Sequence, residues 1–368
     1  MPNTRKFEMR PVPVFSIRYI RLIVWCNIAG MKALVCLKPG EFEYTQIEEP
    51  RLQPGYSMLK IKRIGICGTD LHAYRGTQPY FNYPRILGHE LAAEFVTSND
   101  DTGFSPGESL TFIPYLSCKK CIACRSGKTN CCSSIQVIGV HTDGGMTDYI
   151  SIPNDLLLKS KGLSYDELAL VEPLAIGAHG VRRADIKAGE FVLVSGAGPI
   201  GLGTIAFAKI AGAKVIVTDM NEGRLKFCRE QLNVEYIINA STENVTQRLQ
   251  DITSGDMPTV IFDATGSQAA INNALQYLAH GGRYILIGLQ KNELIFSHPE
   301  FHKRETTLMS SRNAARRDFE YVIQCISNKA IDPLALITHR VKFEEVRNVF
   351  EQWLDPASGV IKAIVEND

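Results

Sequence analysis

Four cysteines lie at a spacing that suits a single metal ion. Cys118, Cys121, Cys124 and Cys132 follow one another with two, two and seven intervening residues. Zinc prefers tetrahedral coordination by thiolates, and a site closed by four cysteines is structural. Cys131, next to Cys132, leaves the fourth ligand ambiguous by one residue. An iron–sulfur cluster and four reduced surface thiols are the alternatives, and the second is disfavoured because exposed thiolates are readily oxidised.

A glycine-rich turn predicts a dinucleotide site. Residues 196–201 read Gly-Ala-Gly-Pro-Ile-Gly, after an apolar strand predicted over 191–195 and before a helix predicted over 199–212. Gly196 permits the tight turn, Gly198 lets the backbone approach a pyrophosphate, and Gly201 allows the helix and strand to pack closely. The helix N-terminus supplies free N–H groups for the phosphates. The alternative is a turn that serves packing alone.

The residues after this turn bear on which dinucleotide binds. Asp219 ends the next predicted strand, where a carboxylate accepts hydrogen bonds from both ribose hydroxyls and repels a 2′-phosphate. NAD is therefore favoured over NADP as the cofactor. Arg224 weakens that preference, because an arginine can bind a 2′-phosphate. We assign to the nucleotide site Gly196, Gly198, Ile200, Gly201, Asp219, Arg224 and Gly288.

Three further segments carry metal-binding and acid–base side chains. Residues 64–76 read IGICGTDLHAYRG, residues 88–90 read GHE and residues 171–173 read VEP. Each is a weak indication alone, because a single cysteine or histidine is more often packed in a core than bound to a metal. Together with the glycine-rich turn, they resemble the zinc-containing medium-chain alcohol/polyol dehydrogenases. The resemblance runs from about Met31 to the C-terminus.

This resemblance implies a catalytic zinc and a structural zinc. In that family the cysteine of GICGTD and the histidine of GHE are ligands, and they correspond to Cys67 and His89. Alcohol dehydrogenases proper have a cysteine where this chain has Glu172, so the sequence resembles the sorbitol and threonine dehydrogenase branch. In that branch one of the two glutamates, Glu90 or Glu172, ligates zinc and the other acts through water, and the sequence leaves open which. The family spacing of the structural site selects Cys118, Cys121, Cys124 and Cys132.

The resemblance also implies a mechanism. A substrate hydroxyl binds the zinc, which lowers its pKa, and hydride passes to the nicotinamide of NAD. Thr69 and His72 form the proton relay to solvent, and Asp70 orients a ligand. Arg312 matches the position at which sorbitol dehydrogenases place an arginine at the substrate hydroxyls. The predicted catalytic residues are Cys67, Thr69, His72, His89 and Glu172.

The expected substrate is a polyol or a sugar acid. Within the branch the sequence is most similar to bacterial L-galactonate and L-gulonate 5-dehydrogenases, and Arg312 suits a carboxylate. His302, Lys303 and Arg304 make the same edge basic, unless they form a solvated surface. Sorbitol-, L-fucose- and L-threonine-type substrates are alternatives in the same class. A catalytically dead nucleotide-binding paralogue and a zinc-ribbon interaction module are alternatives of other classes, disfavoured by the complete metal set and the nucleotide site.

Two kinds of element must position these residues. Short β-type segments with frequent glycine and proline predict a barrel-like domain from residue 31. Alternating strands and helices from about residue 189 predict a doubly wound parallel sheet. The predicted fold is therefore α/β. It combines a GroES-like β-barrel catalytic domain over 31–180 and 315–368, as the resemblance implies, with a Rossmann domain over 181–314.

Composition limits the partners. The chain has 368 residues, of which 45% are hydrophobic and 21% charged, and its formal net charge is +1. This ordinary globular balance argues against a nucleic-acid partner, against a nucleic-acid-binding zinc module and against an anionic membrane surface. No apolar run is long enough for a transmembrane helix. We expect a small-molecule substrate, and the resemblance implies a homodimer or a homotetramer.

The cysteine content and the N-terminal segment give an expectation for where in the cell the protein is located. Ten cysteines in a long chain with no clear signal peptide favour a reducing, cytoplasmic location. Residues 1–30 hold five basic residues and one acidic residue. We interpret them as an extension without an assigned function, in front of a domain whose first strand begins at Met31. A start codon placed too early is the favoured explanation, and a signal or transit peptide is the alternative.

Overall fold

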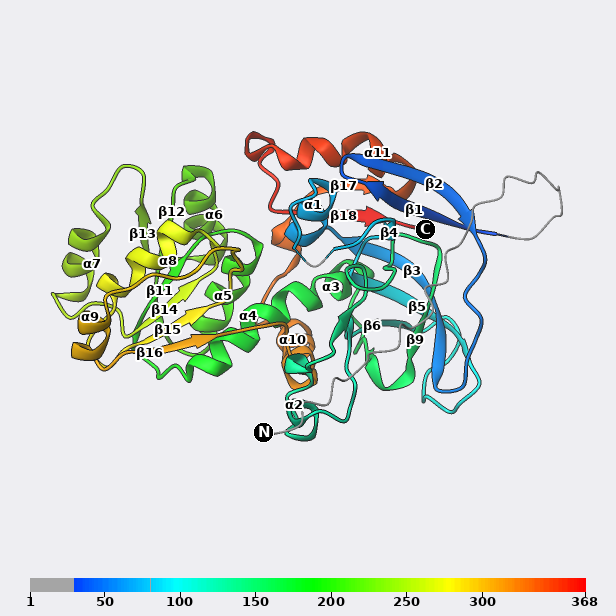
Figure 1. Cartoon of the computed structure of the whole chain (residues 1–368), viewed down its shortest axis with the longest axis horizontal. Helices are drawn as coiled ribbons and strands as arrows, with labels where there is room; N and C mark the ends of the chain where they lie inside the picture. The colour runs from blue at the N-terminus through cyan, green and yellow to red at the C-terminus, as the bar shows by residue number, and fades with distance from the viewer. Residues whose placement is uncertain (1–29, 80) are drawn as a thin grey trace, which may run out of the picture.

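The structure is a computed structural model, and it describes residues 30–79 and 81–368. Nearly all of the predicted extension, residues 1–29, lies outside the described residues. The described chain forms a barrel domain and a parallel-sheet domain, with helix α4 (Val171–Ala184) between them (Figure 1). No helix within the described residues has the length and apolarity needed to cross a membrane.

The barrel domain is built on a seven-stranded sheet in the order β10-β6-β5-β3-β18-β17, with β9 paired to β3. A three-stranded sheet, β2-β1-β4, and a β7-β8 ribbon accompany it. The strands are β1 (Met31–Lys38), β2 (Glu41–Ile47), β3 (Tyr56–Gly65), β4 (Arg85–Ile86), β5 (Glu90–Ser98), β6 (Ser109–Phe112), β7 (Tyr115–Leu116), β8 (Gln136–Val137), β9 (Tyr149–Pro153), β10 (Leu157–Lys159), β17 (Ile337–Lys342) and β18 (Lys362–Glu366). The short helices are α1 (Gly68–Tyr74), α2 (Ile122–Arg125), α3 (Tyr165–Ala169) and α11 (Val346–Val349).

The parallel-sheet domain has six strands in the order β13-β12-β11-β14-β15-β16, and all neighbours run parallel. The central strands are continuous apolar runs, as expected for a sheet covered by helices on both faces. The strands are β11 (Phe191–Ser195), β12 (Lys214–Asp219), β13 (Tyr236–Asn239), β14 (Val260–Asp263), β15 (Arg283–Leu286) and β16 (Thr307–Ser310). The helices are α5 (Pro199–Ile210), α6 (Glu222–Leu232), α7 (Val245–Thr253), α8 (Gln268–Ala274) and α9 (His298–Lys303).

Helix α4 and helix α10 (Arg316–Ser327) connect the two domains. Most of α4 is buried, and a single hydrophobic cluster includes residues of α4, α5, α10 and the parallel sheet. The C-terminal segment returns to the barrel, where β18 pairs antiparallel with β3. The red C-terminal strands accordingly lie beside the blue N-terminal ones in Figure 1. The predicted α/β fold is confirmed, and the domain limits at 180/181 and 314/315 stay a prediction.

Candidate active site

Asp70 ties together the two segments that carry Cys67 and His89. Cys67 precedes the first turn of α1, and its backbone N–H donates to Asp70 Oδ2 at 2.9 Å. The other carboxylate oxygen, Oδ1, accepts from the Gly88 N–H at 3.2 Å. Burial raises the pKa of Asp70, while His89 and the two N–H groups oppose that rise. A fully buried carboxylate thus fixes the backbone on both sides of the site.

Three potential metal ligands meet at this point. One ligand atom from each of Cys67, His89 and Glu90 lies within 4.8 Å of the others, and we call these three residues the donor cluster. His89 Nδ1 is buried without a hydrogen-bond partner and lies 3.7 Å from Asp70 Oδ1. A thiolate, an imidazole and a carboxylate are ligands that zinc accepts in catalytic sites. The donor cluster therefore fits a zinc ion.

Glu172 lies close by but is not a member of the donor cluster as the described residues form it. It stands in the first turn of α4, where it is buried and accepts a hydrogen bond from the Tyr115 hydroxyl. Burial raises its pKa to about 7, although the nearby His89 acts in the opposite direction. The structure thus gives the two glutamates different surroundings, one among the ligands and one beside a tyrosine.

A buried lysine that the sequence analysis did not identify accompanies Glu90. Lys362 Nζ, on β18, donates to Glu90 Oε1 at 2.7 Å, to Oε2 at 2.6 Å and to the Ile66 carbonyl at 3.1 Å. Burial would lower the pKa of Lys362, but the charges of Glu90 and Cys67 raise it. The lone charged residue inside the apolar run 360–365 was the available signal. Lys362 offsets one of several buried negative charges, and a divalent cation would offset more.

The predicted proton relay lies on α1. Thr69 is half-buried and His72 is exposed, three residues further along the same helix. His72 Nδ1 lies 2.9 Å from Thr77 Oγ1. Partial burial lowers the pKa of His72, and the positive charges of Arg75 and Lys291 lower it further. The neutral imidazole of His72 is therefore favoured over the protonated form, as a proton acceptor requires.

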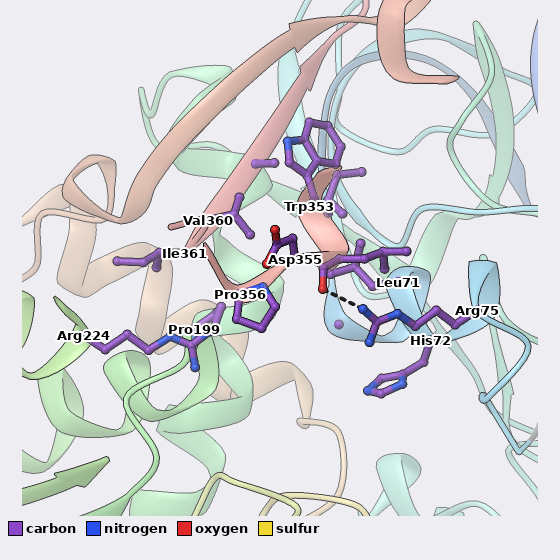
Figure 2. Close-up of a pocket in the computed structure, with 14 residues that line it drawn as sticks. Leu71, His72, Arg75, Pro199, Arg224, Trp353, Asp355, Pro356, Val360 and Ile361 are labelled. Carbon is purple, nitrogen blue, oxygen red and sulfur yellow. Dashed lines mark hydrogen bonds between the residues drawn. The ribbon is translucent and has the colours of Figure 1, made fainter. Parts of the chain in front are cut away.

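A cavity of about 250 Å³ lies between the two domains. Figure 2 shows Arg224 and Pro199 on one side and His72 and Arg75 on the other. The cavity is also lined by Ile66 and Gly68, which are the neighbours of Cys67 in the chain. The chain neighbours of Cys67 and Pro199 of the glycine-rich turn thus line one space from opposite domains.

The glycine-rich turn has the close contacts that its sequence predicts. Gly196 has a φ of 97°, and a Cβ on Gly201 would lie 1.8 Å from the Gly196 carbonyl oxygen. Gly198 is the N-cap of α5, which leaves the first N–H groups of that helix open to a phosphate. The half-buried Ile200 follows in the first turn of α5. Gly288 follows β15, and its N–H donates to the Asp263 carbonyl at 2.9 Å.

The two charged residues of the nucleotide site lie on either side of this turn. Asp219 Oδ2 accepts from the Ala197 N–H at 2.6 Å, and Oδ1 accepts from the Asn221 N–H at 2.8 Å. Arg224 Nη1 lies 3.8 Å from where a Cβ on Gly198 would stand. The arginine therefore reaches over the phosphate-binding turn, while the aspartate ends β12 as the sequence predicts.

The four-cysteine lobe forms a second potential metal site. One sulfur from each of Cys118, Cys121, Cys124 and Cys132 lies within 4.8 Å of the others, whereas Cys131 is exposed. The backbone N–H groups of Cys124 and Ser133 lower the pKa of Cys121 to about 5. Four clustered thiols, one of them readily ionised, fit a zinc ion.

Arg312 lies in the link between β16 and α10. Its side chain is exposed, and its positive charge contributes, after burial, to a lowered pKa of His141. The basic residues that the sequence places on the same edge lie in and just after α9, where Arg304 Nε is 3.6 Å from Glu300. Arg304 also donates to the Leu278 carbonyl at 2.7 Å, a structural contact.

Comparison with known proteins agrees with this geometry. Residues 53–162 match the alcohol dehydrogenase GroES-like domain, and residues 199–328 match the zinc-binding dehydrogenase family. L-galactonate-5-dehydrogenase of Escherichia coli K12 is 42% identical over 92% of this chain and 99% of its own length. A sorbitol dehydrogenase of Halalkalibacterium halodurans is 30% identical over 86% of this chain and 94% of its own length.

A solved structure shows the same architecture. The alcohol dehydrogenase RspB of Escherichia coli CFT073, in complex with NADH, superposes with a TM-score of 0.86. It is 29% identical to this chain, and the superposition covers 92% of this chain and all of the other. The fold, the metal-ligand clusters and these relatives together show that the chain belongs to the zinc-binding alcohol dehydrogenases, among the polyol and sugar-acid dehydrogenases.

Proposed function

We propose that this chain oxidises a secondary alcohol of a sugar acid of the L-galactonate type, with NAD as hydride acceptor and zinc as catalytic metal. The observation that carries the proposal is the placement of the donor cluster. The chain neighbours of Cys67, a member of that cluster, line a cavity whose other wall includes Pro199 of the glycine-rich turn. A metal-bound hydroxyl and a nicotinamide would therefore meet in one space.

The two bound groups would supply the bond-breaking chemistry. Zinc lowers the pKa of a bound hydroxyl and NAD accepts a hydride. The protein residues position them. Asp70 holds the backbone beside Cys67 and His89, and Lys362 holds Glu90 through both carboxylate oxygens. Asp219 offers its carboxylate to the ribose.

The hydroxyl proton has a path along α1. Thr69 lies on the same face of α1 as His72, one helical turn away, which is the separation that lets two helical side chains interact. His72 reaches the solvent-facing side of the cavity, and its neutral form is favoured. We assign Thr69 and His72 to proton transfer, and Glu172 to the water or hydroxyl next to the donor cluster.

Two features favour a sugar acid as the substrate. The relative that is 42% identical over almost its whole length is an L-galactonate-5-dehydrogenase. Arg312 adds a positive charge beside His141, whose loop packs against the GHE segment through the Gly145 N–H to Gly88 carbonyl bond of 2.9 Å. A guanidinium there suits a carboxylate, because it can form two parallel hydrogen bonds to it. A neutral polyol is the second candidate, since a sorbitol dehydrogenase is 30% identical.

A substrate panel tests the proposal. NAD reduction is measured with L-galactonate, L-gulonate, sorbitol, L-fucose and L-threonine. We expect kcat/KM to be highest for one of the two sugar acids and to fall at least about tenfold for sorbitol, because sorbitol lacks the charge that pairs with Arg312. A higher kcat/KM for sorbitol would show that the substrate is a neutral polyol and that the proposed sugar acid is wrong. The Arg312→Met variant is the matched control, since it should reduce kcat/KM for the acids more than kcat/KM for sorbitol.

A further inference from the structure

A buried polar network joins the four-cysteine lobe to the segment that carries Arg312. Asn130 lies in a short 3-10 turn, Thr129–Cys131, and only 3% of its surface is exposed. Its Nδ2 donates to the Arg312 carbonyl oxygen at 2.9 Å and lies 3.3 Å from His179 Nε2. One side chain of the lobe thus contacts both α4 and the link between β16 and α10.

The network continues to a fixed negative charge. His179 Nδ1 lies 2.8 Å from Asp318 Oδ2, and Arg182 Nε donates to Asp318 Oδ1 at 2.6 Å. Arg182 Nη2 lies 2.8 Å from the same His179 Nδ1 and donates to Asp318 Oδ2 at 3.1 Å. Burial would raise the pKa of Asp318, but the hydrogen bonds from His179 and Arg182 lower it to about 2. The network is therefore fully paired, which makes it a rigid anchor.

This anchor fixes the backbone around Arg312 but not its side chain. The Ser311 N–H donates to the Leu286 carbonyl at 2.7 Å, and the Ala315 N–H donates to Asp318 Oδ2 at 2.9 Å. Between them the Arg312 carbonyl accepts from Asn130, and Asn313 has a left-handed φ of 52°. The guanidinium remains exposed. A fixed backbone with a free end is the arrangement expected of a side chain that must reach a ligand from one defined position.

We propose that Asn130 is a positioning residue for the substrate, acting through Arg312. This inference rests on the proposed function, in which Arg312 meets the substrate carboxylate. Without the Asn130 amide, the Arg312 carbonyl loses its partner, and the link between β16 and α10 can shift. Among the described residues, Asn130 forms no hydrogen bond with the donor cluster or with the glycine-rich turn. Loss of the Asn130 amide should therefore weaken substrate binding and leave cofactor binding unchanged.

Steady-state kinetics of Asn130→Ala test this inference. We expect KM for L-galactonate to rise about three- to tenfold, the range that loss of one neutral hydrogen bond produces. We expect kcat to change less than about twofold and KM for NAD to stay constant. A double-mutant cycle with Arg312→Ala gives the decisive comparison. In the Arg312→Ala background, Asn130→Ala should have no further effect on KM.

Equal effects of Asn130→Ala in both backgrounds would overturn the inference, as would a rise in KM for NAD. Asn367→Ala is the matched control, because Asn367 is also a buried asparagine that donates to two backbone carbonyls, those of Ile61 and Thr147. It should cost similar stability and leave KM for L-galactonate unchanged. If Asn130→Ala does not fold, Asn130→Ser takes its place in the cycle.

The experiment separates this inference from the proposed function. If the wild-type enzyme oxidises another polyol in place of the sugar acids, the proposed substrate is wrong. The same cycle is then measured with that polyol. Non-additive effects of Asn130→Ala and Arg312→Ala would still support a positioning role, and additive effects would reject it.

Discussion

The charge around His72 determines the pH at which this residue can accept a proton. Partial burial, Arg75 and Lys291 all lower its pKa. Arg75 is held close, because its Nη2 donates to the Leu354 carbonyl at 2.6 Å (Figure 2). A positive neighbour disfavours the protonated imidazole, so the neutral form extends to lower pH than for an isolated histidine.

Removing that positive charge should shift the pH profile. In Arg75→Gln, a side-chain amide can still donate to the Leu354 carbonyl, but the pKa of His72 rises. In the proposed relay the deprotonated histidine is the active form, so the acid limb of kcat/KM should move to higher pH. The shift should be larger at low ionic strength, where charges are less screened. An acid limb that stays in place in Arg75→Gln, or persists in His72→Asn, would contradict the assigned role.

Site residues that lie in a short sequence motif could be predicted. Site residues that the fold brings together from distant parts of the sequence could not. The spacing of the four cysteines implies ligation, and the family resemblance implies it for Cys67 and His89. The structure brings each set together. Lys362 follows Glu90 by more than 270 positions, and only the pairing of β18 with β3 brings it to the site. No local pattern encodes that contact.

At the scale of elements, β18 closes the barrel next to the strand that leads to Cys67. Ile364 pairs with Gly65, and Val365 pairs with Ile64. This register places Lys362 beside Glu90, where both side chains are almost completely buried. A buried ion pair adds little net stability over an apolar pair, yet removal of one partner leaves an uncompensated charge.

Lys362→Met should therefore destabilise the protein strongly. We expect a loss of about 3 kcal/mol in the free energy of unfolding, measured by chemical denaturation. The double variant Lys362→Met with Glu90→Gln should recover part of this loss, because it removes the unpaired carboxylate. The exposed pair Lys32–Glu344, at 2.9 Å, provides the control. Lys32→Met should cost less than about 1 kcal/mol, and an equal cost for both lysines would contradict the argument.

The strands of the parallel sheet show which elements a sequence reveals. The central strands β11, β12, β14 and β15 are apolar runs, and the first of them was expected over 191–195, which are its observed limits. The two edge strands, β13 and β16, were not expected. Their side chains are largely half-buried or exposed, so the pattern is less apolar. Edge strands are therefore the hardest part of such a sheet to predict from sequence.

At the scale of the whole molecule, two potential metal sites serve different purposes. The donor cluster includes Cys67, whose chain neighbours line the cavity between the domains, and Lys362 donates to its Glu90. Asn130 of the four-cysteine lobe contacts His179 of α4 and the Arg312 carbonyl in the link before α10. In the proposed function the first site serves the chemistry, and we expect the second site to stabilise the fold. Loss of metal from the first site should therefore reduce turnover, and loss of metal from the second site should reduce stability.

Elemental analysis of the purified protein should find about two zinc ions per chain. Cys67→Ser should keep about one zinc and the wild-type melting temperature, with turnover lost. Cys132→Ser should also keep about one zinc, but the melting temperature should fall, because the lobe loses a ligand. Cys131→Ser, one residue away and exposed, should match the wild type in all three measurements. Two zinc ions in Cys67→Ser, or an equal loss of zinc in Cys131→Ser and Cys132→Ser, would show that the ligands are wrongly assigned.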